Sequence, residues 1–198
     1  DYFWGYNRMT TIDGLFGAGD AVGGTPHAFS SGSFTEGRLA AKAACKYIDD
    51  GKAEGIVVSD EQISRRKKEI YKPLEHYKTY RNAIVAGSVN PHYINPKQGL
   101  DRLQKLMDEY CGGVTVNYMT NEKLLNIGLK KLAIMEEDLE KLAAEDIHEL
   151  LRAWELKHRH RAAECVTQHT LFRKETRWPG YYYRGDAMKV DDENWHVL

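Results

Sequence analysis

The stretch NPKQGLDRLQKLMDEYCGG, residues 95–113, carries a full set of signals for one amphipathic helix. Asn95 is a residue type that caps helices, and Pro96 suits the first turn, where its missing N–H has no helical partner anyway. The paired glycines at 112 and 113 are typical of a helix end. Apolar residues recur at intervals of three and four between these signals: Leu100, Leu103, Met107 and Tyr110. Such spacing places them on one face, so the stretch predicts a helix that packs on other helices.

Further helices are predicted before this stretch. Ser59 and Gln62 form a capping-box pattern, which predicts a helix from Asp60 to about residue 72. Pro73 is expected to kink or restart this helix, and helical sequence continues to about Val85.

Two helices are predicted after it. Asn121 opens one, whose expected buried face is Leu125, Leu129, Leu132, Leu139 and Leu142. Asp146 with Glu149 opens the last long helix, whose expected buried face is Leu150, Leu151, Trp154 and Cys165. Short connections between amphipathic helices favour an antiparallel bundle of three or four helices over residues 56–170.

The amino-acid composition excludes several classes of protein for this chain. The 198 residues are 42% hydrophobic and 29% charged, with a net charge of −1, which gives no sign of nucleic-acid binding. No apolar run approaches the roughly 20 residues that span a bilayer. The three cysteines, Cys45, Cys111 and Cys165, lie far apart without CxxC spacing, which predicts reduced thiols in a cytoplasmic protein and no metal site. The chain opens on DYFWGYNRM without an initiator methionine, so we expect a piece of a longer protein.

A different pattern occupies residues 14–44, GLFGAGDAVGGTPHAFSSGSFTEGRLAAKAA. It predicts a short buried strand ending at Asp20, a loop of small residues, and a helix from about Ser33 to Asp49. A carboxylate after small residues can accept hydrogen bonds from sugar-like hydroxyls, and the N–H groups of a helix start favour an electron-rich ligand edge. A flavin meets both demands; the alternative is a strand–turn–helix that packs closely for structural reasons. The candidate cofactor-binding residues are Gly19, Asp20, Ser30, Ser31, Gly32 and Ser33.

The GLFGAGDA and EGRLAAKAA segments resemble the second flavin-contacting segment of the fumarate reductase and succinate dehydrogenase flavoprotein family. FSSGS and the tail ETRWPGYYYRGD are similar to the branch of that family that reduces adenylylsulfate. The resemblance covers nearly all of the chain. It implies a mainly α fold, in which residues 1–55 are the C-terminal fragment of an α/β FAD-binding domain. Residues 56–198 would be a helical bundle with an irregular aromatic tail.

This resemblance also implies an activity. The intact flavoprotein would use FAD to reduce adenylylsulfate to sulfite and AMP, or catalyse the reverse. Electrons would come from a beta subunit with two [4Fe–4S] clusters, in keeping with three cysteines here that do not suit cluster ligation. The chain has no G-x-G-x-x-G loop for the FAD pyrophosphate. The missing N-terminal part would supply that loop and the catalytic residues, so we expect the fragment alone to be inactive.

One difference in sequence distinguishes the adenylylsulfate-reducing branch from the fumarate- and succinate-type branch. Fumarate- and succinate-type enzymes carry a carboxylate-binding arginine about where this chain has Ser30, and a serine cannot replace the two-point grip of a guanidinium. Phe3 and Phe29 are candidates to stack on the substrate adenine, or else are packing residues. A fumarate or succinate flavoprotein, or a helical module that docks a partner subunit, remain the alternatives.

Three further groups of charged or titratable residues were considered as candidate sites. His158 and His160, beside Arg159 and Arg161, are expected on a solvated or interfacial basic face. Acids in IMEEDLEK, residues 134–141, are expected to face solvent. In the tail, Arg177 and Arg184 are candidates for a functional role; the alternative for Arg177 is an ion pair that pins the tail to the core.

Overall fold

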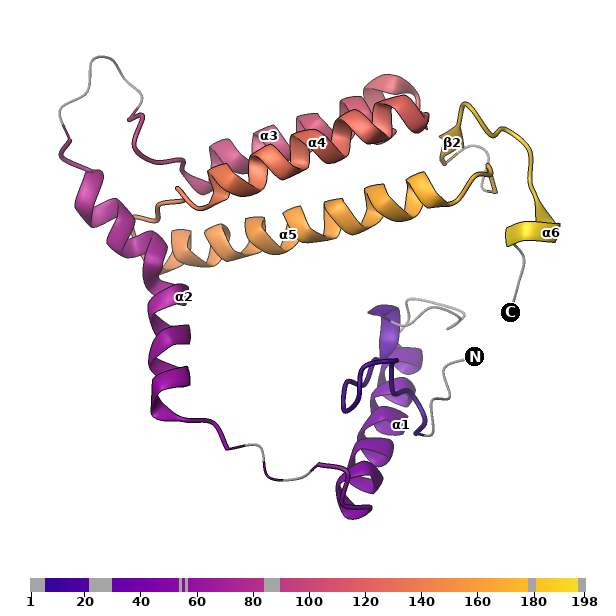
Figure 1. Cartoon of the computed structure of the whole chain (residues 1–198), viewed down its shortest axis with the longest axis horizontal. Helices are drawn as coiled ribbons and strands as arrows, with labels where there is room; N and C mark the ends of the chain where they lie inside the picture. Colours follow the sequence, from indigo (N-terminus) through magenta and orange to yellow (C-terminus); the bar gives the residue numbers. More distant parts are fainter. Residues whose placement is uncertain are drawn as a thin grey trace. The chain divides into compact units, whose positions relative to one another are not determined.

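The computed structural model describes residues 6–21, 30–53, 55, 57–83, 90–177 and 181–195. The chain divides into two compact units, residues 1–60 and 61–197. Figure 1 shows a mainly helical molecule, which confirms the expected fold class. None of the helices in the described ranges is long and apolar enough to cross a bilayer.

The N-terminal unit is built on one long helix. Helix α1, Ser30–Asp49, begins three residues earlier than predicted and is rich in alanine, the strongest helix former. Residues 6–17 fold back on themselves through a bridge between Met9 and Phe16. The ring of Tyr47 on α1 packs edge-on against Tyr6 and Phe16, with centroids 5.1 and 6.0 Å away.

The strand expected over residues 14–20 is present only as that single bridge. It is followed directly by the 3-10 turn η1, Gly19–Ala21. Strand geometry depends on neighbouring strands, and within the described part of this unit Phe16 pairs only with Met9.

Three helices form the core of the C-terminal unit. They are α3 (Pro96–Tyr110), α4 (Glu122–Leu139) and α5 (Ile147–Phe172), which lie side by side (Figure 1). The predicted caps are confirmed: the side chains of Asn95, Asn121 and Asp146 accept hydrogen bonds from the first turns of α3, α4 and α5. The apolar core between the helices is Leu103, Leu106, Leu132, Met135, Leu139, Leu142, Ala153, Leu156 and Ala163.

Helix α2, Asp60–Tyr80, continues through Pro73 without a break and ends before the predicted Val85. Its second half rests on the bundle, because the carbonyl of Pro73 accepts the N–H of Ala144 and that of Ile70 accepts Nε1–H of Trp154, both at 3.0 Å. These contacts hold the helix together at a residue that cannot donate a backbone hydrogen bond.

The segment after α5 is irregular but well anchored. Strand β2 (Tyr183–Arg184) pairs in parallel with β1 (Met119–Thr120), which follows the 3-10 turn η2 (Val114–Val116). A short helix, α6 (Asp192–Trp195), ends the described part, and Trp195 packs edge-on against Phe172 at 5.2 Å. The expectation that the aromatic tail packs on something is thereby confirmed for Trp195.

The predicted buried face of α5 was right for Leu150, which is 6% exposed, but wrong for Leu151 and Cys165, and Trp154 is half-buried. Leu151 is 55% exposed and Cys165 is also exposed, whereas the residues facing the core are Leu150, Ala153, Leu156, His160, Ala163 and Thr167. Two alanines, a histidine and a threonine occupy positions where a search for large apolar residues finds nothing. A pattern of large apolar residues therefore could not identify this face, because half or more of its members are small or polar.

Candidate functional site

The turn at Gly19 and the first turn of α1 meet in the N-terminal unit. Gly19 has φ +66°, a left-handed conformation that residues with a side chain rarely adopt. A Cβ atom at this position would lie 3.3 Å from Oγ of Ser33, which is tighter than most such contacts, so the two segments lie close together. The structure thus brings together two of the predicted cofactor-binding residues, which are 14 positions apart in the sequence.

The remaining predicted residues cluster at the start of α1. Ser30, Ser31 and Ser33 are exposed and Gly32 is half-buried. An open hollow of about 520 Å³ lies beside them, lined by Ser30, Ser33, Phe34, Gly37 and Arg38. The first N–H groups of a helix have no partner within the helix and carry its positive dipole end. Of the predicted residues, Ser30 and Ser33 line this hollow, together with Phe34, Gly37 and Arg38 from the next turns of α1.

Three predicted positions cannot be placed. Phe3 and Phe29 lie outside the described residues, and of Asp20 the backbone is described, in η1, but not the side chain. Their roles remain predictions.

An ion pair between the half-buried Arg8 and the buried Glu36 fixes α1 to the segment before the turn, and no local sequence pattern predicts it. Arg8, which has φ +66°, donates from Nη2 to Oε1 of Glu36 at 2.7 Å, and its Nε lies against Oε2 of the same carboxylate. Glu36 is buried, and among the described residues Arg8 is the cation that forms an ion pair with it. Without that partner, a buried carboxylate would be costly. Glu36 follows Ser33 by three residues, so the pair also sets where the first turn of α1 lies. The only sequence signal was an acid among small residues of a helix.

Arg184 joins the tail to the end of α5. Its side chain is 1% exposed, and it contacts the carboxylate of Asp186 at two points, from Nε to Oδ1 and from Nη2 to Oδ2, both 3.0 Å. Nη1 donates to the backbone carbonyls of Thr170, Leu171 and Arg173. These carbonyls belong to the last turn of α5 and the residue after it, where no helical N–H follows. Arg184 is therefore a C-terminal cap contributed from a distant segment.

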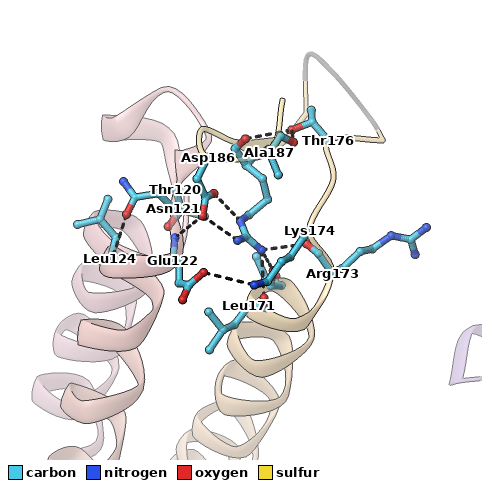
Figure 2. Close-up of polar contacts among 12 residues, drawn as sticks. Thr120, Asn121, Glu122, Leu124, Leu171, Arg173, Lys174, Thr176, Asp186 and Ala187 are labelled. Carbon is cyan, nitrogen blue, oxygen red and sulfur yellow. Dashed lines mark hydrogen bonds and ion pairs between the residues drawn. The ribbon is translucent and has the colours of Figure 1, made fainter. Parts of the chain in front are cut away.

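Asp186 extends this contact to a second helix. Figure 2 shows Asp186 beside the first turn of α4, where it accepts the N–H of Glu122 at 3.0 Å. Lys174 reaches the Glu122 carboxylate in the same view. The charged Arg184 beside it is the largest cause that lowers the pKa of Asp186 to about 2.

Arg177 also has a structural partner. It donates to Glu175, which is buried, and to Oδ1 of Asp192 at 2.9 Å. The Arg177 guanidinium is the main cause that lowers the pKa of Glu175 to about 2. Of the two alternatives for Arg177, the ion pair is the one that the structure contains, and here it ties the tail to itself and to α6.

His160 is not on a basic surface, contrary to the sequence analysis. It is 3% exposed, and Nε2 lies 2.8 Å from the backbone carbonyl of Leu132 on α4. A carbonyl only accepts, so Nε2 carries the proton. His158 is exposed and lies beside the Trp154 ring. No group of three or more His, Cys, Asp or Glu side chains with metal-binding geometry occurs in the ranges that the structure describes.

Fold and candidate site together define the class of protein to compare: a helical domain that follows a glycine turn and a serine-rich helix start. Residues 100–198 match the family model described as "Fumarate reductase flavoprotein C-term". The match covers half of the chain, and the chain belongs to this flavoprotein family.

Individual relatives show which members of the family this chain resembles. It is 45% identical over 193 residues to "Adenylylsulfate reductase subunit alpha" of Megalodesulfovibrio gigas, covering 96% of this chain and 28% of that protein. The solved adenylylsulfate reductase of Archaeoglobus fulgidus is 56% identical, with a TM-score of 0.90 over 96% of this chain and 29% of the solved one. An E. coli quinol fumarate reductase matches at 22% identity and a TM-score of 0.65, which shows a shared fold only. The chain therefore spans less than a third of the length of these relatives.

Proposed function

We propose that this chain is the C-terminal part of an adenylylsulfate reductase alpha subunit. The intact protein would reduce adenylylsulfate to sulfite and AMP, or run the reverse reaction. The observation that carries this proposal is the 56% identity, with a TM-score of 0.90, to the Archaeoglobus fulgidus enzyme across 96% of the chain. A solved structure of adenosine-5-phosphosulfate reductase with a covalent sulfite adduct is equally similar.

The fumarate- or succinate-type alternative has weaker support. Two solved proteins, Mycobacterium smegmatis Sdh1 and the E. coli quinol fumarate reductase, are each 22% identical to this chain, which supports a shared fold alone. A carboxylate of fumarate would be bound by a guanidinium through two parallel hydrogen bonds. This chain has Ser30 at about the position where the fumarate- and succinate-type enzymes carry that arginine. Phe3 and Phe29 remain our candidates to stack on the adenine of adenylylsulfate.

We assign residues 1–55 to the end of the FAD-binding domain and residues 56–198 to the helical domain. When bound, FAD supplies two-electron transfer. Asp20 would accept hydrogen bonds from the ribityl hydroxyls, and the N–H groups of Ser31, Gly32 and Ser33 would face the pyrimidine edge of the ring. Reduction places negative charge on that edge, so these donors favour the reduced form. Gly19 and Ser30 are small residues beside these donors, and they would leave room for the flavin ring.

The partners in this proposal are the N-terminal part of the same subunit and an iron–sulfur beta subunit that delivers electrons. A cytoplasmic location fits the three free cysteines, of which Cys45 and Cys165 are exposed. Alone, the fragment would bind FAD weakly and turn over no substrate, because most of the cofactor site lies outside it. A flavin titration of the isolated chain tests this point: tight stoichiometric binding would contradict it.

The assignment of Asp20 is tested in the full-length subunit. Asp20→Asn keeps the size of the side chain and removes its charge, so we expect the purified protein to retain less FAD, measured by absorbance per polypeptide. Asp13→Asn is the matched control, because Asp13 is exposed in the preceding turn. Full FAD retention in both variants would refute the role of Asp20.

The substrate is tested separately in the assembled enzyme. We expect a reduced electron donor to be oxidised on addition of adenylylsulfate and not on addition of fumarate. Oxidation by fumarate alone would instead establish the alternative.

A further inference from the structure

Helix α5 carries a second, largely apolar line on the side opposite the core, in which two of the members are histidines. Counting by threes and fours from its first residue gives a row without a single acid, lysine or arginine, which we call the outer stripe. It consists of Ile147, Leu151, Trp154, His158, Ala162, Cys165, His169 and Phe172. A helix that is apolar on one side only needs one packing partner, whereas a helix with two apolar sides is typical of a buried element.

The outer stripe is open in this structure. Ile147, Leu151 and Phe172 are 65, 55 and 72% exposed, and only Trp154 is half-buried. The core face of the same helix includes Ala153 at 0% and Leu156 at 1%. Isolated exposed apolar residues are common on surfaces, but a row along a 26-residue helix marks an interaction site.

Two elements flank the middle of the outer stripe. Near one end Trp154 donates to the carbonyl of Ile70 on α2, and at the other Phe172 packs on Trp195 of α6. From Trp154 to Phe172 the helix rises about 27 Å, at roughly 1.5 Å for each step along the chain. Ala162 and Cys165 are small and lie at the middle of this span, where they permit a close approach by another element.

We propose that the outer stripe is the surface on which the preceding, flavin-binding portion of the same polypeptide packs. The inference rests on the proposed function only in taking this chain as part of a longer subunit. The relatives have more than two-thirds of their length outside the matched region, so the longer subunit offers a large body of chain as the occupant of this surface. A row free of charge is typical of permanent contacts, because transient interfaces are more polar. A partner that binds through charge, such as a nucleic acid, would find no lysine or arginine within the row itself.

Thiol labelling in the full-length subunit tests whether the outer stripe is covered. Cys165 is on the stripe, and peptide-level mass spectrometry follows its reaction with a maleimide. Ile134→Cys is the matched control, since Ile134 is 56% exposed on α4 and off the stripe. We expect Cys165 to react at least about tenfold more slowly than the control, because a covered thiol reacts only when the surface opens locally. Equal rates would overturn the proposal.

A photo-crosslinker identifies the occupant. With p-benzoyl-phenylalanine in place of Ala162, we expect a crosslink within one polypeptide to sequence that precedes this chain. A crosslink to a second copy or to another subunit, any other product, or none, overturns this assignment. Turnover and FAD content of the same preparation report separately on the proposed function, so an inactive protein with a protected Cys165 would reject that function and keep this inference.

Discussion

The guanidinium of Arg184 binds the carboxylate of Asp186 at two points and, through its third nitrogen, the carbonyls that end α5. One side chain that is 1% exposed thus joins the tail, the end of α5 and, through Asp186, the start of α4. Because this side chain is buried, its loss leaves the carbonyls at the end of α5 without their side-chain donor and leaves Asp186 with the N–H of Glu122 but without its cation.

We therefore expect Arg184→Met to lower the free energy of unfolding by about 1–3 kcal/mol, because the carbonyls at the end of α5 lose their donor, whereas Asp186, at 33% exposed, can still be hydrated. Arg184→Lys should also be destabilised, because an ammonium cannot reproduce the planar fork. Urea denaturation measures both variants. Lys97→Met is the control, since Lys97 is 82% exposed, and should change stability by less than about 0.5 kcal/mol. A stability near that of the control in Arg184→Met would contradict the capping role.

Acid should weaken the tail through Glu175 and Asp186. Both have a native pKa of about 2, below their ordinary values of 4.5 and 3.8. A depressed native pKa means that the stabilisation is complete above the unfolded pKa and is lost as pH falls from about 4.5 towards 2. Urea denaturation at pH 7, 5 and 3 should show this loss, and Glu175→Gln should show a smaller one. Glu61→Gln, on the exposed part of α2, should follow the unchanged protein. An identical pH dependence in all three proteins would show that Glu175 does not contribute.

Gly19 should be required for the cofactor site for a reason beyond its backbone conformation. Gly19 and Gly51 both have positive φ, at +66° and +70°, but only Gly19 has a neighbour, Ser33, where a Cβ would lie. Alanine in a left-handed conformation costs about 1–2 kcal/mol at either position. In the full-length subunit we expect Gly19→Ala to lower the FAD content and Gly51→Ala to leave it unchanged. Equal FAD content would mean that the Gly19–Ser33 approach is not part of the site.

Gly99 should be required for the packing of α3 on α5. A Cβ at this helical position would overlap Cδ2 of Leu156, which is 1% exposed and has little room to move. Gly99→Ala should destabilise the bundle by about 1–3 kcal/mol through overpacking, in spite of the better helix propensity of alanine. Gly37→Ala on α1 is the opposite case, because no atom lies within 4 Å, and it should stabilise its helix by about 1 kcal/mol. Thermal unfolding of the two variants should shift in opposite directions.

The sequence alone determined the features that depend on neighbours within one or two turns. The caps at Asn95, Asn121 and Asp146 each act on an N–H three residues away, so residue type and spacing were sufficient to place three helix starts correctly. The mainly α fold and the family resemblance followed from the same kind of local pattern. The stretch around Gly19 and Ser33 could be singled out because small residues are unusual beside an acid.

Only the tertiary structure decided which distant residues meet. Arg8 and Glu36 are 28 positions apart, and the Arg184 cap acts on α5 from 11 to 14 positions beyond its carbonyls. It also decided which side of α5 faces the core. Both sides carry apolar residues, and the choice depends on how closely α3 and α4 approach, which small residues such as Ala153 permit and no local pattern reveals. Local hydrogen bonds are encoded by spacing along the chain, whereas packing depends on the shapes of surfaces that the chain brings together only when it folds.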